Sequence, residues 1–597
     1  MDDLSADQST FFRALSAQWA GGDDTFERLP ATASRKRLRK DGVAGWRTVL
    51  PTDYLGKDRW LEVIVPADPQ SRGADLYVTP NPFLDWPHAE SDGRLCLWPP
   101  GRAPVWLPMD QLAEATVDRL RWLFGLVDSA AGVEGRADEF AQEWTSYWVL
   151  RKQPDQRAAG RLILVEPPAS TPALMPAILV SAGGQGKRVI VGNDLKATQR
   201  WIAQSTFVPI DTTPSKALVV ALRAAPSMPG APQTTEDISS FIDAWAAEPG
   251  TAGPVFDSLI QEDGELPRWV VFHQGRDAVT ALQLSPRFSS LNQRRFRNDR
   301  ERRNARAQRR LTGMSVAVMA VDRVDPDWIY ERGRSDAARI LSNCHVVAVG
   351  CGSLGSQVID GLALSGVGTI TLVDPDSFEG ANVGRHTLGV GSIGEDKVEA
   401  IRSRLLADYP HLKVTGHSVP VQDADNELAQ TLADADLVIS TSADPACERY
   451  LMRQIDDGIR ALLIAWAEPH ALAGHSIYLR KGNPPIESLF ERGRYRFPAV
   501  RWHTEQAESL PGCGASHLPG AGNRIRWIAT QVVEHAIDGL TAQDAFDQQR
   551  CFVESSDVIA KAGGERIRPA SFGPGAVLEM DIHVGLNEPE RQRASGP

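Results

Sequence analysis

The sequence predicts a multidomain α/β protein whose last domain is a doubly wound nucleotide-binding unit. Its 597 residues are enough for about three to four domains of ordinary size. From about residue 160, short apolar runs typical of strands alternate with amphipathic runs typical of helices. A glycine-rich turn, GCGSLG, directly follows the strand-like run HVVAV and precedes a helix-like run. This order of strand, glycine turn and helix is typical of a parallel sheet that binds a nucleotide.

Composition and charge exclude several classes of protein. Hydrophobic residues make up 42% of the chain and charged residues 23%, as in ordinary globular proteins. The net charge of −12 argues against a nucleic-acid binder. No apolar run approaches the ~18 residues of a membrane span, and the N-terminus MDDLSADQSTFFRAL is too polar for a signal peptide. We therefore expect a cytoplasmic protein that binds neither nucleic acid nor membranes.

Residues 1–155 are expected to form a mixed α+β domain. Helices are predicted at FFRALSAQWA and WLPMDQLAEATVDRLRWLFGLV, and a strand at RWLEVIVPADP. The Pro-, Asp- and Gly-rich stretch between this strand and the second helix is expected to be mostly loop.

Residues 156–330 are expected to form an α/β linker domain without an evident catalytic constellation. Its last part, residues 287–310, holds ten arginines and two acidic residues. Such a run is typical of a solvated connector, and it also suits a basic surface for an acidic partner or for phosphates. The sequence leaves both interpretations open.

The glycine turn opens the third predicted domain, residues 331–597. Gly350, Gly352 and Gly355 would let backbone amides and a helix N-terminus approach a phosphate. Asp374 ends the next predicted strand, where an acid binds ribose hydroxyls. To this point NAD and ATP fit equally well.

Polar residues beyond the second strand favour ATP. Asn382, Arg385 and Lys397 would stabilise the charge that develops when a carboxylate attacks the α-phosphorus and pyrophosphate leaves. Hydride transfer has no general need for such a cluster. Asp444 ends a later strand, where a carboxylate can hold Mg²⁺ on the phosphates.

The run from Val346 to Ile401 strongly resembles the adenylation domain of ubiquitin-activating-type enzymes, which are also called E1-like or ThiF-type. The resemblance covers about residues 335–545 and implies a Rossmann-like fold that uses MgATP. It implies that Asp374 binds the ribose, and that the cluster beyond the second strand acts on the phosphates with Asp444 at the metal. It also implies a head-to-head homodimer, in which an arginine ahead of the first strand, Arg332 or Arg334, completes the partner's site.

Cys513 is the first candidate nucleophile. It lies in a Gly/Pro-rich loop before an amphipathic helix, where a thiol is exposed and a helix N-terminus lowers its pKa. In activating enzymes of this type the catalytic cysteine lies in such a crossover loop. Cys344, Cys351 and Cys447 lie in strand or helix patterns and are expected to be buried, and Cys551 is less well placed than Cys513.

Cys96 is the second candidate. The segment HAESDGRLCLWPP resembles the active-site segment of ubiquitin-conjugating (E2-like) enzymes, in which a histidine precedes the cysteine. Two departures stand out: His88 lies close to the cysteine, and Ala89 and Glu90 stand where eukaryotic members have an oxyanion-stabilising Asn. Another donor must then serve, or His88 itself takes that role.

An E2-like (UBC) domain, a linker domain and an E1-like domain in this order resemble the bacterial E2–E1 fusion proteins of CBASS antiphage operons. The resemblance implies that the substrate is the C-terminus of a cGAS-like nucleotidyltransferase (CD-NTase) in place of ubiquitin. It would be adenylated with MgATP, captured on Cys513, passed to Cys96 and joined to a target lysine in antiphage defence. A different ubiquitin-like modifier would leave this chemistry unchanged.

Three alternatives remain open from the sequence. A ThiF/MoeB-like activator of a sulfur-carrier protein would use the same adenylation site but leaves residues 1–155 without a role. An NAD-dependent oxidoreductase is disfavoured by the Asn382, Arg385 and Lys397 cluster. A non-enzymatic scaffold with a degenerate site is disfavoured because all five polar site residues are present.

Overall fold

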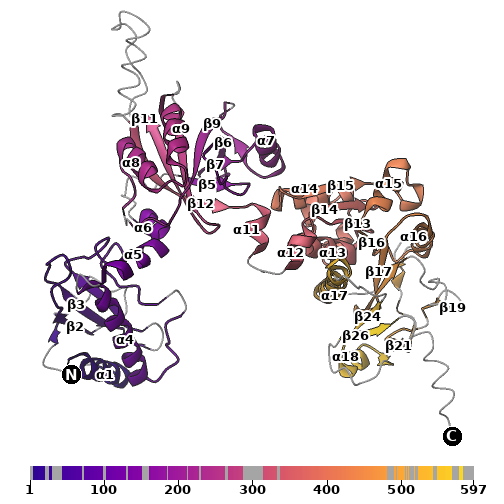
Figure 1. Ribbon diagram of the computed structural model, residues 1–597. Coiled ribbons are helices and arrows are strands. Elements are labelled where there is room, and N and C mark those ends of the chain that lie inside the picture. The colour runs from indigo at the N-terminus through magenta and orange to yellow at the C-terminus, as the bar shows by residue number, and fades with distance from the viewer. Residues whose placement is uncertain are drawn as a thin grey trace, which may run out of the picture.

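The computed structural model places three α/β parts along the chain, each with its own sheet (Figure 1). It describes residues 4–20, 26–29, 44–66, 68–69, 73–98, 102–128, 132–150, 160–184, 186–211, 213–227, 230–261, 266–286, 314–331, 336–480, 490–491, 494–495, 497–504, 506, 508–509, 516–517, 522–541, 548–567 and 577–581. The arginine-rich segment 287–310 therefore lies outside the described residues.

The first part is a four-stranded antiparallel sheet with two long helices against it. The sheet order is β1-β2-β3-β4, and helices α1 and α4 pack against each other and share one core with the strands. In α4, buried residues recur every three or four positions, which presents one apolar face to that core. The bounds are α1 Ala6–Ala20, β1 Glu27–Arg28, β2 Ala44–Val49, β3 Trp60–Val65, β4 Asp75–Thr79 and α4 Met109–Val127.

Two short helices, α5 (Val133–Gln142) and α6 (Trp144–Leu150), follow and lead to the second part. Trp144 and Trp148 of α6 are fully buried in the core of the second part, and Trp148 packs edge-on against Phe241. Tyr147, between them in sequence, makes its hydrogen bond to the first part instead. Helix α6 therefore ties the first two parts together.

The second part is a closed barrel. Its strands follow the order β7-β5-β12-β11-β10-β9-β6, and β6 pairs with β7 to close the ring, with β8 added at β6. Each of the seven strands contributes to one apolar cluster that includes Leu162, Val189 and Trp269. These residues alternate with others that pack under the helices, so the cluster fills the barrel interior. The strand bounds are β5 Arg161–Leu164, β6 Ala173–Ser181, β7 Lys187–Val191, β8 Val208–Pro209, β9 Ser215–Ala221, β10 Arg268–Gln274, β11 Ala278–Pro286 and β12 Met314–Arg323.

Three helices cover the outside of the barrel: α7 (Leu195–Gln204), α8 (Thr235–Trp245) and α9 (Pro249–Gln261). Helix α8 begins with a capping box in which Thr234 accepts from the N–H of Asp237 and the Asp237 carboxylate accepts from that of Thr234. The alternation predicted for residues 156–330 is thus a mixed sheet covered by helices, and the closure into a barrel was not evident from the pattern.

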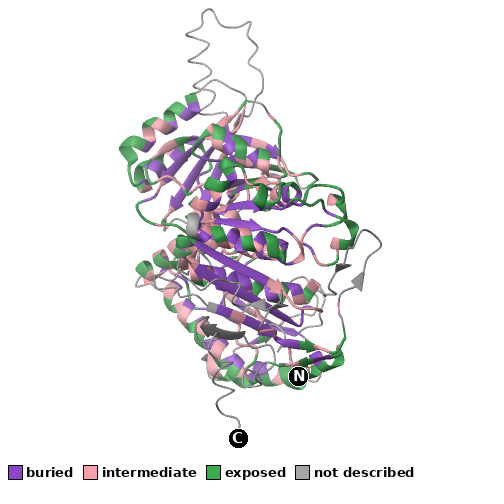
Figure 2. Cartoon of the chain, turned by 90° about the vertical axis from the view of Figure 1, so that its right-hand side faces the viewer, coloured by how far each residue is buried: buried purple, intermediate pink, exposed green. Residues whose placement is uncertain are grey.

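The third part is a doubly wound sheet of order β15-β14-β13-β16-β17-β18-β24-β26. The first five strands are parallel and the last three antiparallel, and buried residues concentrate on the strands (Figure 2). The strand bounds are β13 His345–Val349, β14 Thr369–Val373, β15 Lys413–His417, β16 Leu437–Ser440, β17 Ala461–Ala467, β18 Ala473–Arg480, β24 Gln548–Val553 and β26 Val577–Asp581. Chain order reverses between β13 and β16, and ligands of such sheets bind at the carboxyl ends of the strands at this switch point.

Helices lie on both faces of this sheet, with α13 and α17 packed together on one of them. The helices are α11 Pro326–Glu331, α12 Asp336–Leu341, α13 Ser353–Leu364, α14 Lys397–Asp408, α15 Asn426–Asp434, α16 Pro445–Asp457, α17 Gly522–Thr541 and α18 Ser556–Lys561. Short strands pair as β19 (Phe490–Glu491) with β20 (Arg494–Tyr495), β21 (Val500–Trp502) with β25 (Gly564–Arg566), and β22 (Glu508–Ser509) with β23 (Ser516–His517). Among the described helices, none has the length and apolar character that crossing a bilayer requires.

Candidate active site

Two glycines of the turn after β13 are required by its geometry, and the third lies beside open space. Gly350 has a φ of +90°, and a Cβ there would lie 2.7 Å from the Ser442 nitrogen on the neighbouring strand's loop. A Cβ at Gly355 would lie 1.9 Å from the Gly350 carbonyl oxygen. Gly352 meets nothing within 4 Å, and it precedes α13 without a side-chain cap. The turn is therefore tight toward the protein and open where a ligand would approach the amides of α13.

Asp374 ties this turn to the end of β14. Its carboxylate accepts hydrogen bonds from the N–H groups of Cys351 (2.6 Å) and Asp376 (2.8 Å). Burial raises the pKa of Asp374, and Lys397, with its Nζ 3.9 Å from the carboxylate, opposes that rise. The carboxylate is thus fixed at the point where the sequence predicts ribose binding.

Lys397 begins α14 and is largely buried. Its Nζ donates to Asp376 at 2.7 Å, so within the described residues the ammonium is held by a carboxylate that is itself mostly exposed. To contact phosphates as predicted, the Lys397 ammonium would have to bind the ligand while it stays paired with Asp376.

Arg385 is the least satisfied cation of the site. It follows the 3-10 turn η5 (Gly380–Asn382), in which the Asn382 amide oxygen accepts from the N–H of Glu379. The Nε of Arg385 is buried and has no hydrogen-bond partner within the part of the chain that the structure describes. A buried donor without an acceptor costs about 1–3 kcal/mol, which a bound anion would recover.

His386 is a positioning residue that the sequence analysis missed. Its Nδ1 accepts from the N–H of Leu388 (3.0 Å), so its Nε2 carries the proton and donates to the Cys351 carbonyl (2.8 Å). Burial lowers the pKa of His386, which keeps the ring neutral. The only signal in the sequence was its position beside Arg385.

Asp444 follows β16 and caps α16. Its Oδ1 accepts from the N–H of Ala446 at 3.0 Å, and the preceding Ala443 has a φ of +52°, a strained value that is concentrated at functional sites. Among the described residues no cluster of three or more His, Cys, Asp or Glu side chains can enclose a metal ion. A single carboxylate fits Mg²⁺, which usually binds to one or two carboxylates, waters and substrate phosphates.

These groups meet at one edge of the sheet. The hydroxyl of Thr441, at the end of β16, donates to the Gly350 carbonyl at 2.8 Å, which joins the two sides of the switch point. The structure therefore brings Asp374 and Lys397 to the glycine turn and places Asp444 after the neighbouring strand. Arg385 lies beside His386, which bonds to Cys351 of the turn, and the Asn382 side chain contacts Glu379 of its own turn. Such an edge can bind a nucleotide phosphate chain beside fixed cations.

Three predicted residues lie outside the described part of the chain: Cys513, Arg332 and Arg334. The helix that follows Cys513 is described, and it begins at the site. A Cβ at Gly522, the first residue of α17, would lie 2.5 Å from the Gly384 carbonyl and 3.3 Å from the Cα of Arg385. Cys344, Cys351 and Cys447 are buried, which confirms the expectation for these three, and Cys551, the less well placed nucleophile candidate, is buried as well.

Cys96 and His88 lie opposite each other on a short ladder in the first part. Ala89 and Leu95 form an antiparallel bridge, and the Cys96 N–H donates to the His88 carbonyl at 2.7 Å. His88 has a φ of +58°. Upstream, the buried guanidinium of Arg59 holds the loop through Asp53 and Asp85, each at 2.6 Å.

Carboxylates surround this pair. The His88 Nε2 lies 2.8 Å from Glu139, and its Nδ1 lies 3.8 Å from Glu143. Burial, together with Glu90 and Glu143, raises the pKa of the Cys96 thiol, against weaker opposition from Arg94 and Arg119. Cys96 is thus a half-buried thiol in an acidic setting, which the sequence motif did not indicate.

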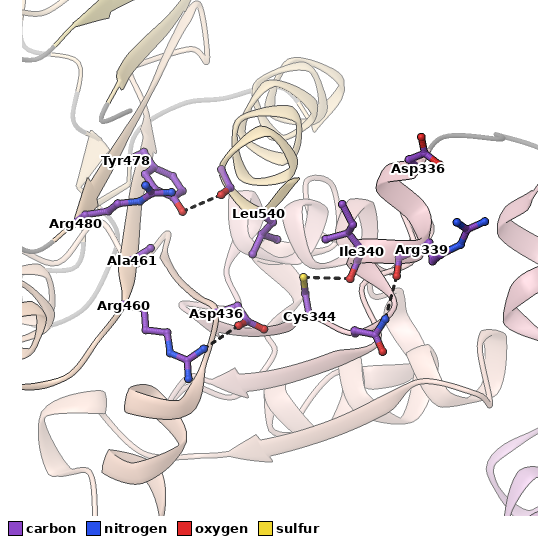
Figure 3. A pocket seen from close by; sticks show the side chains of 12 residues that line it. Asp336, Arg339, Ile340, Cys344, Asp436, Arg460, Ala461, Tyr478, Arg480 and Leu540 are labelled. Carbon is purple, nitrogen blue, oxygen red and sulfur yellow. Dashed lines mark hydrogen bonds and ion pairs between the residues drawn. The ribbon is translucent and has the colours of Figure 1, made fainter. Parts of the chain in front are cut away.

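A cavity of about 1050 Å³ lies at the opposite, amino edge of the third sheet (Figure 3). Figure 3 shows Cys344, Ile340 and Leu540 at its centre and the arginines Arg339, Arg460 and Arg480 around them. None of the predicted site residues that the structure describes lines it; they lie toward the opposite, carboxyl edge.

A comparison with known protein families identifies a domain in the third part. Residues 329–459 match the model of the ThiF family. The third part therefore contains a ThiF family domain, which covers residues 329–459.

Several curated relatives match part of the chain. The molybdopterin-synthase adenylyltransferase of Escherichia coli is 35% identical over 117 residues, which are 19% of this chain and 46% of that protein. The ATP-dependent ubiquitin transferase-like protein Cap2 of Pseudomonas aeruginosa is 29% identical over 143 residues, which are 23% of this chain and 25% of Cap2. The chain thus spans less than half the length of these curated relatives. A solved structure of E. coli MccB with ATP covers 48% of this chain and 72% of its own at 15% identity and a TM-score of 0.28, a likeness too small to carry an argument.

Proposed function

We propose that this protein uses MgATP to activate the C-terminal carboxylate of a protein, carries the acyl group as a thioester and joins it to an amine. The observation that carries the proposal is the edge of the third sheet, where the glycine turn is open at Gly352 and Arg385, next to the His386 that bonds to Cys351 of the turn, has a buried Nε with no partner among the described residues. An anion that reaches both would satisfy the amides of α13 and Arg385 together.

The residues suggest a division of labour during adenylation. Asp374 would accept from the ribose hydroxyls, while Asn382, Arg385 and Lys397 would stabilise charge as the carboxylate attacks the α-phosphorus and pyrophosphate leaves. Bound at Asp444, Mg²⁺ would neutralise the phosphates. The products are an acyl-adenylate and pyrophosphate.

The acyl group would next pass to a thiol. Helix α17, the described helix that follows Cys513 in sequence, starts against Gly384 and Arg385, which supports Cys513 as the acceptor thiol. A thiolate there would displace AMP, and Cys96 would then take the acyl group by thioester exchange. A second copy of the chain is expected in the active assembly, with Arg332 or Arg334 reaching across.

The partner class is inferred from the domain order and from the relatives. The name of Cap2 describes an ATP-dependent ubiquitin transferase-like protein, which supports transfer to a second protein. We propose the C-terminus of a cGAS-like nucleotidyltransferase in CBASS defence, or else a ubiquitin-like modifier, with lysine side chains as final acceptors. The action would be cytoplasmic.

A second candidate function is activation of a sulfur-carrier protein, which the match to molybdopterin-synthase adenylyltransferase favours. It uses the same adenylation site and needs neither His88 nor Cys96.

Pyrophosphate exchange tests the shared step. The full chain should exchange labelled pyrophosphate into ATP only when a protein with the correct free C-terminus is present, and a des-glycine or amidated C-terminus serves as the control. Calorimetry should show binding of ATP with Mg²⁺ and none of NAD. Binding of NAD without exchange would exclude the proposal. Exchange by a parent chain that forms no amide conjugates, with a rate that Cys96→Ala leaves unaltered, would favour sulfur-carrier activation.

A further inference from the structure

The carrier site contains a tyrosine that neither the motif nor the comparisons assign. Tyr147 lies on α6, about fifty residues after Cys96 in the chain, and is buried. Its hydroxyl accepts a hydrogen bond of 2.7 Å from the backbone N–H of His88. His88 is the residue directly opposite Cys96 on the ladder, where paired Cα atoms lie roughly 4.5–5.5 Å apart.

The strained backbone of His88 explains why this contact exists. In a regular antiparallel pair, His88 would direct its N–H toward the strand that bears Cys96. With a φ of +58°, the residue keeps only its carbonyl on that strand and gives its N–H to Tyr147. Strain of about 1–3 kcal/mol at a non-glycine residue persists where the surroundings enforce it, and such residues cluster at functional sites.

The position of Tyr147 is fixed from the other side as well. Trp144 and Trp148, on the flanking turns of α6, are fully buried against the barrel. Phe140 of α5 packs against the tyrosine ring with centroids 5.3 Å apart. The hydroxyl is therefore held in place by two domains rather than by a surface loop.

Transfer of an acyl group from Cys96 to an amine needs a hydrogen-bond donor for the oxyanion, and the sequence motif supplies none. When an amine attacks a thioester on Cys96, the new C–N bond places negative charge on the carbonyl oxygen. The C–S bond then breaks, its electrons leave on sulfur, and the proton lost from nitrogen neutralises the thiolate or goes to solvent. Burial, Glu90 and Glu143 raise the pKa of the Cys96 thiol, which makes its thiolate a poor leaving group, so the step depends on stabilising the oxyanion.

We propose that the Tyr147 hydroxyl donates the hydrogen bond that stabilises this oxyanion. The Tyr147 oxygen accepts a hydrogen bond from the His88 N–H, and its own O–H proton is free to be donated elsewhere. In the structure without substrate, the Glu143 carboxylate lies near enough to accept that proton's hydrogen bond. Burial and Glu143 raise the pKa of Tyr147 well above its usual range, so the proton stays on oxygen at working pH. The inference rests on the proposed function, because it assigns a role within transfer from Cys96.

The test uses the full chain with Cys513→Ala, so that the remaining cysteines apart from Cys96 are buried. Cys96 is loaded chemically with an acetylglycyl aryl thioester, without ATP, and its discharge to Nα-acetyl-lysine is followed by intact-protein mass spectrometry. In Y147F the discharge should slow by about 10²-fold, the usual cost of one oxyanion donor. The matched control is Y54F, which removes another hydroxyl of the same domain, one that donates to the Asp85 carbonyl at 2.7 Å, and it should stay within about twofold.

Alkylation of Cys96 by iodoacetamide separates a donor from a structural role, because alkylation forms no oxyanion. Y147F should alkylate at the rate of the parent chain. Equal discharge in Y147F and parent, or a parallel loss of alkylation and discharge, would overturn the proposal. Because loading bypasses ATP, a failure of adenylation would appear in pyrophosphate exchange and not in this assay.

Discussion

The two candidate sites of this chain are built in opposite ways. The site in the third domain gathers residues from the ends of parallel strands, and its unsatisfied group is a cation, Arg385. The site in the first domain depends on a left-handed residue, His88, and on helices that arrive later in the chain, and its surroundings are acidic. The comparison shows that the two candidate sites differ in charge: the first has an unsatisfied cation, and the second has carboxylates around His88 and Cys96.

The largest expected effect is on the cationic site. Arg385→Ala should reduce partner-dependent pyrophosphate exchange by about 10³-fold, because the buried donor for the developing phosphate charge is lost. The matched control is Arg402→Ala, which removes an exposed arginine of α14 that pairs with Glu399 at 2.7 Å. Near-normal pyrophosphate exchange in Arg385→Ala would show that Arg385 does not act on the phosphates, and the proposed difference in charge between the two sites would lose its main support.

Asp444→Asn should have the next largest effect. The substitution keeps a side-chain acceptor for the Ala446 N–H that caps α16 but removes the charge that would hold Mg²⁺. Exchange should fall by about 10²-fold and regain part of its rate at high Mg²⁺. An unchanged dependence on Mg²⁺ would show that the metal, if used, binds elsewhere.

Two alanine substitutions in the glycine turn should have different effects: one should lower the free energy of unfolding, and the other should weaken ATP binding. Gly355→Ala places a Cβ 1.9 Å from a backbone oxygen and should cost about 2–3 kcal/mol of unfolding free energy, measured by denaturant titration. Gly352→Ala meets nothing within 4 Å and should leave stability nearly unchanged while it weakens ATP binding in calorimetry. If both variants lose stability equally, the turn is not open toward a ligand.

The smallest effect concerns the acidic site. Glu143→Gln removes a carboxylate that raises the pKa of the Cys96 thiol, so the pKa should fall and the thiolate fraction at pH 7.5 should rise. Because Glu143 is half exposed, we expect alkylation by iodoacetamide to speed up by about twofold to fourfold. The pH profile should shift to lower pH, and a shift to higher pH would contradict the acidic setting described here.

The positions of the glycine turn, Asp374 and Asp444 were predictable from the sequence, because each follows a strand of the parallel sheet. The rest of the polar cluster follows Asp374 within the loop after β14 and at the start of α14. His386 and Tyr147 were not predictable, because neither belongs to a recognisable spacing. His386 acts through its tautomer and burial, and Tyr147 reaches His88 only because α6 packs on the barrel. The closed barrel was missed for the same reason, since ring closure between β6 and β7 leaves no local pattern beyond the hairpin.

The arrangement of the domains bears on the relay. Figure 1 shows the first part below the barrel, connected through α6, and the third part to the right of the barrel, connected through α11. Because Cys96 and helix α17, the described helix that follows Cys513 in sequence, belong to separate parts, the proposed transfer would need these parts to approach each other within one chain or between two copies.

The most direct test of the relay is the identity of the charged cysteine. The full chain is incubated with MgATP and a cGAS-like nucleotidyltransferase that ends in a free carboxylate, and thiol-sensitive adducts are mapped by mass spectrometry. We predict an adduct on Cys96 in the parent chain and none on Cys96 in Cys513→Ala. Charging of Cys96 in the Cys513→Ala chain would contradict the relay.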